Sequence, residues 1–175
     1  MLMVASAVQA QRSKPTEYQV KAVYLYNFGK FVSWPEKSKI SDTSDGFNLC
    51  VLGTDPFGPA LEATVSDETV DGRKVVLKRI SNAQEAASCR IVFVSASETD
   101  HMKATLEALN SGVALTVSDV PGFANQGGMI EFVIEDSRVR FEVNLTAAQH
   151  AGLTLSSELL KVATSVKKSP PPGGH

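Results

Sequence analysis

The sequence predicts a single three-layer α/β domain, with a mixed, mostly parallel sheet, helices on both faces and an antiparallel hairpin at one edge. Two observations predict this fold. Short apolar runs bounded by turn residues alternate with helical segments three times in succession, as in β-α units that build a parallel sheet. The chain has 175 residues and is 43% hydrophobic, which suffices for one substantial core.

The first helix is predicted over residues 15–34, where apolar side chains recur at helical spacing. Trp34 ends it, because the residue before a proline is pushed out of the helical region. Strands are predicted over residues 47–52, 74–80, 90–95, 113–117, 129–134 and 138–145. Further helices are predicted to end near residue 63 and to span residues 83–87, 100–110, 146–151 and 156–166.

The last two strands are predicted to form the hairpin, because residues 135–137 have the composition of a tight turn. The domain is expected to occupy residues 15–166. Residues 167–175 contain a Pro-Pro-Pro-Gly-Gly run and are expected to be a disordered tail.

The N-terminal segment, residues 1–14, predicts export. Its first ten residues are apolar or small, and Val8-Gln9-Ala10 fits the small-x-small rule for signal-peptide cleavage. The alternative interpretation is a disordered N-terminus. No other stretch reaches the roughly 18 to 20 consecutive apolar residues of a membrane span. The sequence therefore predicts a periplasmic protein that is soluble after the signal peptide is removed.

Two cysteines, Cys50 and Cys89, lie in strand-like segments without CxxC spacing or companion histidines, so no metal site is predicted. In an oxidising periplasm they are expected to form a disulfide. The alternative is a pair of buried free thiols. A bond requires Cα atoms within about 7 Å. It would therefore make the strands at residues 47–52 and 90–95 neighbours, as in a flavodoxin-like strand order.

Composition and motifs exclude several functions. The formal net charge is -2 and the basic residues are scattered, which argues against a nucleic-acid partner. The sequence lacks the dinucleotide-binding, P-loop, nucleophile-elbow and HExxH motifs. We therefore predict no catalytic residues, no cofactor and no enzymatic activity.

Four polar residues follow predicted parallel strands, where open α/β sheets bind ligands. They are Thr54, Asp55, Ser97 and Asp119. One interpretation is a rim that binds a small ligand. The other is that these residues only cap helices and form turns.

The first predicted helix is unusually aromatic, since it contains all three tyrosines and the only tryptophan. Tyr24, Phe28 and Phe31 are expected to face the core. Tyr18, Tyr26 and Trp34 are then candidates for a partner or homodimer surface, because exposed aromatics favour such interfaces. The alternative is that other parts of the same subunit cover them.

Several motifs together resemble one known family. They are KAVYLYNF at 21–28, KFV at 30–32 and WP at 34–35; LCVLG at 49–53 and DPFG at 55–58; LTVSD at 115–119, PGFA at 121–124 and GGMI at 127–130; residues 138–144; and AA at 147–148, AGL at 151–153 and SSELL at 156–160. They resemble the YfiR-like periplasmic proteins, and the resemblance covers nearly all of residues 18–163.

The resemblance implies a periplasmic, dimeric regulator that restrains a membrane-bound diguanylate cyclase by protein contact. An outer-membrane lipoprotein would draw it away, which raises cyclic di-GMP and favours biofilm. Cys50 and Cys89 resemble one disulfide of the family's founding member, whereas a second cysteine pair found there is absent. The alternative hypothesis is a periplasmic small-ligand sensor that uses the rim of Thr54, Asp55, Ser97 and Asp119.

Overall fold

The computed structural model describes residues 14–35 and 46–168. The predicted signal peptide therefore lies, except for Lys14, outside the described residues, as do residues 169–175 of the predicted tail. An eight-stranded sheet has the order β10-β8-β7-β6-β5-β2-β4-β3. Its strands are β2 (Phe47–Leu52), β3 (Thr69–Val70), β4 (Arg73–Ile80), β5 (Ile91–Val94), β6 (Leu115–Ser118), β7 (Ile130–Glu135), β8 (Arg138–Asn144) and β10 (Ser165–Lys167).

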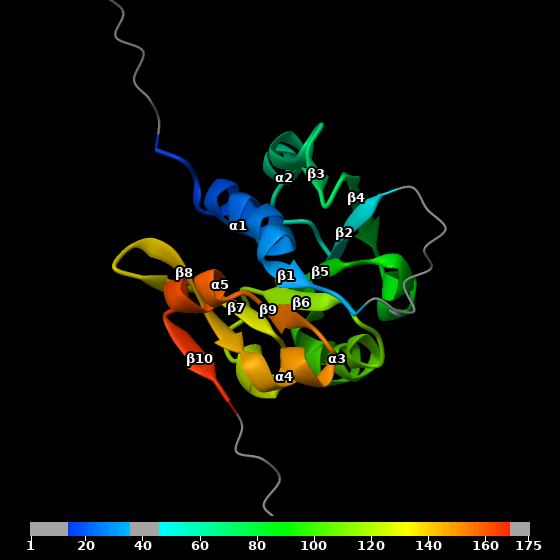
Figure 1. Cartoon of the computed structure of the whole chain (residues 1–175), viewed down its shortest axis with the longest axis vertical. Helices are drawn as coiled ribbons and strands as arrows, with labels where there is room; N and C mark the ends of the chain where they lie inside the picture. Colours follow the sequence, from blue (N-terminus) through cyan, green and yellow to red (C-terminus); the bar gives the residue numbers. More distant parts are fainter. Residues whose placement is uncertain (1–13, 36–45, 169–175) are drawn as a thin grey trace, which may run out of the picture.

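Helices lie on both faces of this sheet. The α-helices are α1 (Glu17–Phe31), α2 (Pro59–Val65), α3 (Met102–Asn110), α4 (Leu145–His150) and α5 (Ser157–Val162). The 3-10 helices are η1 (Ala83–Ser88), η2 (Ala96–His101) and η3 (Ala124–Gln126). In Figure 1, α1 and α2 lie above the central strands and α3 lies below them.

The predicted fold class is confirmed. Strands β4, β2, β5, β6 and β7 are parallel neighbours in that order, which is the flavodoxin-like arrangement. Strands β7 and β8 form the antiparallel hairpin. β10 lies outside β8 and pairs with it in parallel, so the hairpin is next to the edge strand.

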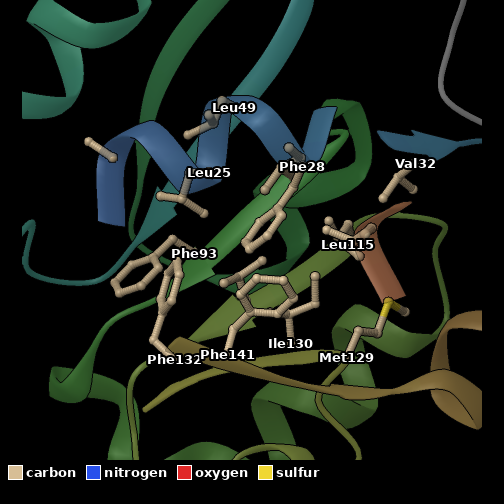
Figure 2. Close-up of a cluster of buried hydrophobic side chains, with 14 of the residues drawn as sticks. Leu25, Phe28, Val32, Leu49, Phe93, Leu115, Met129, Ile130, Phe132 and Phe141 are labelled. Atoms are coloured by element: carbon tan, nitrogen blue, oxygen red, sulfur yellow. The ribbon is translucent and has the colours of Figure 1, made fainter. Parts of the chain in front are cut away.

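Alternation along the central strands divides the core into two clusters. In β2, Leu49 and Val51 face the α1 side, whereas Cys50 and Leu52 face the α3 side. This is the period-two pattern of a strand buried on both faces. On the α1 side, Phe28 packs against Phe132 and Phe141, with ring centroids 5.8 and 5.1 Å apart (Figure 2).

The predicted disulfide is present on the α3 side. Cys50 in β2 and Cys89, just before β5, are bonded with their Cα atoms 6.0 Å apart. Both residues are buried. The bond therefore joins two neighbouring parallel strands, as the cysteine positions predict.

The ends of two predicted helices were wrong. The first helix stops at Phe31, because Val32 and Ser33 form β1, which pairs with Thr154 and Leu155 of β9 (Thr154–Leu155). The last helix stops at Val162. The segment Ser165–Lys167 extends the sheet instead, which also places Lys167 in a strand where a tail was expected. Both segments meet partners that are distant in sequence, and local periodicity carries no information about such partners.

Candidate partner-binding surface

The N-cap residue Thr16 stabilises the first turn of helix α1. The Thr16 hydroxyl accepts a hydrogen bond from the Gln19 backbone N–H at 3.2 Å, and the Gln19 side chain accepts one from the Thr16 backbone N–H at 2.7 Å. This capping box satisfies two backbone donors at the helix start. Glu17 in the first turn and Lys30 in the last also suit the helix dipole.

A buried charge ties α1 to the carboxyl ends of the parallel strands. The Lys21 side chain is only 2% exposed, and its Nζ lies 2.8 Å from a carboxylate oxygen of Asp119, which follows β6. Lys21 also pairs with Glu17, one turn earlier. Sequence reasoning chose Asp119 but missed Lys21, because a lysine on a helix is ordinarily solvated.

Tyr18 joins the same cluster. Its hydroxyl donates a hydrogen bond to Asp119 at 2.8 Å, and the Lys21 ammonium lies 4.5 Å from its ring centroid. Burial, the hydrogen bond to Asp119 and the negative charges of Asp119 and Glu17 raise the pKa of Tyr18 far above its usual value. The structure thus brings together Tyr18 and Asp119, which the sequence assigned to two different sites.

The other two aromatic candidates are half-buried and have partners within the chain. The Tyr26 hydroxyl donates to the Glu68 carboxylate at 2.9 Å and to the Thr69 carbonyl at 3.1 Å. The Trp34 ring packs edge-on against Phe47 with centroids 5.4 Å apart. These contacts favour the interpretation that the subunit itself covers much of both rings.

Three of the four rim residues lie close together at the ends of β2 and β5. The Ser97 hydroxyl accepts a hydrogen bond from the Thr54 backbone N–H at 3.0 Å. The Asp55 carboxylate accepts from the Phe57 backbone N–H and from the Arg79 side chain. Their polar groups therefore serve loop and turn contacts within the chain.

Asp119, the fourth rim residue, is connected to this group through aromatic packing. Tyr18, which it binds, packs edge-on against Phe57 with centroids 5.4 Å apart. Asp119 therefore contacts Tyr18 and Lys21 of α1 and also belongs to the strand-end rim.

Helix α1 carries two exposed apolar residues on the side that faces away from the core. Phe31 was expected in the core but is 39% exposed, and Val23 is 48% exposed. Val20 and Tyr24 are half-buried and pack against the core. The Tyr24 ring centroid lies 6.0 Å from that of Phe132 and 5.6 Å from that of Phe141, so Tyr24 faces the core as expected. Val23 and Phe31 thus leave apolar surface of α1 that the described part of the chain does not cover.

A hollow lies between α1 and the β7–β8 hairpin. We name this hollow of about 410 Å³ the α1–hairpin groove; its lining includes Val20, Tyr24, Ile134, Arg138 and Arg140. Ile134 is 54% exposed, so its side chain is available at the mouth of the groove. Figure 1 shows the hairpin, in yellow, projecting beside the blue α1.

Fold and surface together define a doubly wound α/β domain with one disulfide and with Val23 and Phe31 exposed on α1. The sequence pattern of the YfiR/HmsC-like family matches residues 18–164. The chain therefore belongs to the YfiR/HmsC-like family.

Solved structures agree on the fold. A conserved domain protein from Vibrio cholerae superposes with a TM-score of 0.53 at 13% identity, covering 74% of this chain and 57% of that one. The ABC domain from Streptococcus pneumoniae in complex with L-Trp gives a TM-score of 0.56 at 12% identity, covering 86% and 60%. This chain thus spans less than two thirds of either. No curated protein matches significantly.

Within the described ranges, no helix is both long enough and apolar enough to cross a bilayer.

Proposed function

We propose that this protein is a periplasmic regulator that restrains a membrane-bound diguanylate cyclase through direct protein contact. The observation that carries the proposal is the match to the YfiR/HmsC-like family over residues 18–164. The buried disulfide supports an oxidising compartment, where such bonds persist. The exposed side chains of Val23 and Phe31 on α1 support a protein partner, since exposed apolar surface favours interaction sites.

The same proposal includes a homodimer and an outer-membrane lipoprotein that relieves the restraint. In an interface of this kind, the exposed edges of Tyr18, Tyr26 and Trp34 would lie at the rim. Each of them is partly accessible although its polar or ring contacts are within the chain.

The proposal is tested by deleting the gene in its own host and measuring cyclic di-GMP. We expect the deletion to raise cyclic di-GMP, and expression of the exported chain to restore the original level. The same chain without an export signal is the control and should not restore it. A second measurement is co-purification of the exported chain with the periplasmic region of a membrane diguanylate cyclase of that host. Unchanged cyclic di-GMP together with no co-purification would refute the proposal.

A further inference from the structure

The β7–β8 hairpin extends beyond the end of β6, the strand next to it in the sheet. The pairing of β6 with β7 stops at Ser118, which lies opposite Glu131. It stops because the Val120 N–H, which would be the next donor to β7, instead donates to the Ser118 hydroxyl at 3.1 Å. Within the described part of the chain, residues 132–135 of β7 therefore have a partner strand on the β8 side only.

The main chain of Ile134 points to this open edge. On the side of β8 that faces away from β7, the Phe141 carbonyl accepts a hydrogen bond from the Thr164 N–H at 2.9 Å. Phe141 and its cross-strand partner Phe132 therefore form a non-hydrogen-bonded pair, in which both main chains point out of the ladder. Ile134 lies two residues further along and has the same orientation. No hydrogen bond among the described residues reaches its N–H or its carbonyl.

A hollow of about 290 Å³ lies along this edge, and we name it the β7-edge hollow. Its lining includes four consecutive residues of β7, 131–134, whose side chains alternate between the two faces of the sheet. A hollow that contacts residues from both faces borders the edge of the strand. Pro121, in the loop after β6, also lines it and has no N–H with which to pair. The hollow thus occupies the place where β6 would continue.

The charged groups that line the β7-edge hollow favour a basic occupant. They are one ammonium group, that of Lys21, and three carboxylates, those of Glu17, Asp119 and Glu131. Glu17 is 48% exposed, so its carboxylate is accessible to an occupant. Carboxylates outnumber the ammonium group, and they select cationic side chains through charge-assisted hydrogen bonds.

The outer edge of the hairpin, on β8, has the opposite charge. Val139 lies opposite Ile134, so its main chain also points out of the ladder. β10 pairs only with residues 142–144 and does not cover it. Val139 is flanked in β8 by Arg138 and Arg140, so a basic strand would meet like charge there. The two open edges therefore differ in the strand that they accept.

We propose that the open edge of β7 binds an extended segment of a partner protein that carries lysine or arginine and adds to the sheet as a strand in line with β6. Main-chain hydrogen bonds to Ile134 hold the segment, as in strand addition to other exposed sheet edges. Its cationic side chains face Glu17 and Asp119, which makes the binding selective. The inference rests on the proposed function only in taking a protein as the partner.

The test measures binding by fluorescence anisotropy to the full chain with its disulfide intact. The probe is a labelled, end-capped peptide of alternating valine and lysine, and the comparison peptide carries glutamate in place of every lysine. We expect the lysine peptide to bind at least about tenfold more tightly than the glutamate peptide, with affinity falling as salt rises.

Two methylated peptides test whether the main chain is recognised. One carries N-methyl groups on its valines and the other on its lysines. The N–H groups of these two sets point to opposite edges of an extended strand, and only one edge meets β7. One methylated peptide should therefore lose affinity by about tenfold or more, whereas the other should stay close to the unmethylated peptide.

Amide hydrogen exchange, followed by NMR, locates the site. The Ile134 amide should exchange rapidly in the free protein, and saturating lysine peptide should slow its exchange by at least about tenfold. The Val139 amide, on the opposite edge of the same hairpin, is the matched control and should change by less than about twofold.

Two variants test the charge preference. Glu17→Gln removes one carboxylate of the β7-edge hollow and should weaken binding of the lysine peptide by about threefold or more. Glu62→Gln makes the same change at an exposed residue outside the hollow and should alter affinity by less than about twofold. Circular dichroism should show that both variants are folded.

The inference is overturned if the lysine peptide does not bind, if both methylated peptides lose affinity equally, or if binding protects Val139 instead of Ile134. It is also overturned if the Ile134 amide is protected in the free protein and loses protection on dilution, because the occupant is then a second copy. If the peptide protects Ile134 but no cyclase region co-purifies, the edge assignment stands and the proposed function fails. If the cyclase region co-purifies but leaves Ile134 exchange unchanged, the proposed function stands and the edge assignment fails.

Discussion

At the scale of single residues, Lys21 shows how one buried charge organises the N-terminal helix. Its ammonium group is compensated by Glu17 and Asp119 and lies over the Tyr18 ring. Removing one member of such a set leaves a buried charge without full compensation, and this is more costly than the loss of an exposed ion pair.

Asp119→Ala should therefore lower the free energy of unfolding by about 2 to 4 kcal/mol, measured by urea denaturation. The double variant Lys21→Met/Asp119→Ala should lose less than the sum of the single changes, since it removes the orphaned charge as well. Glu62→Ala is the control, because that carboxylate is 73% exposed and should change stability by less than about 0.5 kcal/mol. Equal effects of Asp119→Ala and Glu62→Ala would contradict this account.

Sequence analysis singled out two of the four residues that contact one another here. The four are Glu17, Tyr18, Lys21 and Asp119, and the two are Tyr18 and Asp119. Asp119 was predicted to lie at the end of a parallel strand, and Tyr18 on the aromatic helix, but their contact joins residues 101 positions apart. The helical pattern of residues 15–34 gave no reason to bury Lys21, since a lysine on a helix is ordinarily solvated.

At the scale of secondary-structure elements, the capping box of Thr16 and Gln19 stabilises the start of α1. Thr16→Ala should reduce the free energy of unfolding by about 1 kcal/mol, because the helix loses its N-cap acceptor. Thr16→Ser keeps the hydroxyl and should stay close to the wild type in the same urea titration. If both variants behave alike, the hydroxyl does not provide the stabilisation.

Most elements follow from local pattern. Strands β2, β5 and β6 are short buried runs between turn residues, and the hairpin turn at residues 136 and 137 coincides with positive φ at both positions. β1, β9 and β10 were missed because two or three residues carry too short a pattern, and only pairing with a distant strand makes them extended.

At the scale of the whole molecule, the Cys50–Cys89 bond joins two central strands of the sheet. A loop of this size contributes roughly 3 to 4 kcal/mol in the chain-entropy model, by restricting the unfolded chain. The double variant Cys50→Ala/Cys89→Ala should therefore unfold at markedly lower urea concentration, with a loss of about 2 to 5 kcal/mol.

Because both sulfur-bearing residues are buried, a reductant should act on the wild type only slowly under native conditions. It should cause a comparable loss once the chain unfolds in urea. The double variant is the control, since reductant should not change its unfolding curve at all. A wild-type curve that is insensitive to reductant would mean that the bond contributes nothing to stability.

The sequence by itself determined the order of the main strands and helices, the parallel sheet, the adjacency of β2 and β5 and the family. The first three follow from local hydrophobic period, turn residues and one covalent constraint, whereas the family follows from the resemblance of its motifs. Only the tertiary structure decided that Lys21 meets Asp119, that Ser165–Lys167 joins the sheet and that Phe31 faces outward. The physical reason is that these outcomes depend on contacts between residues far apart in the chain, whose free energy no local pattern contains.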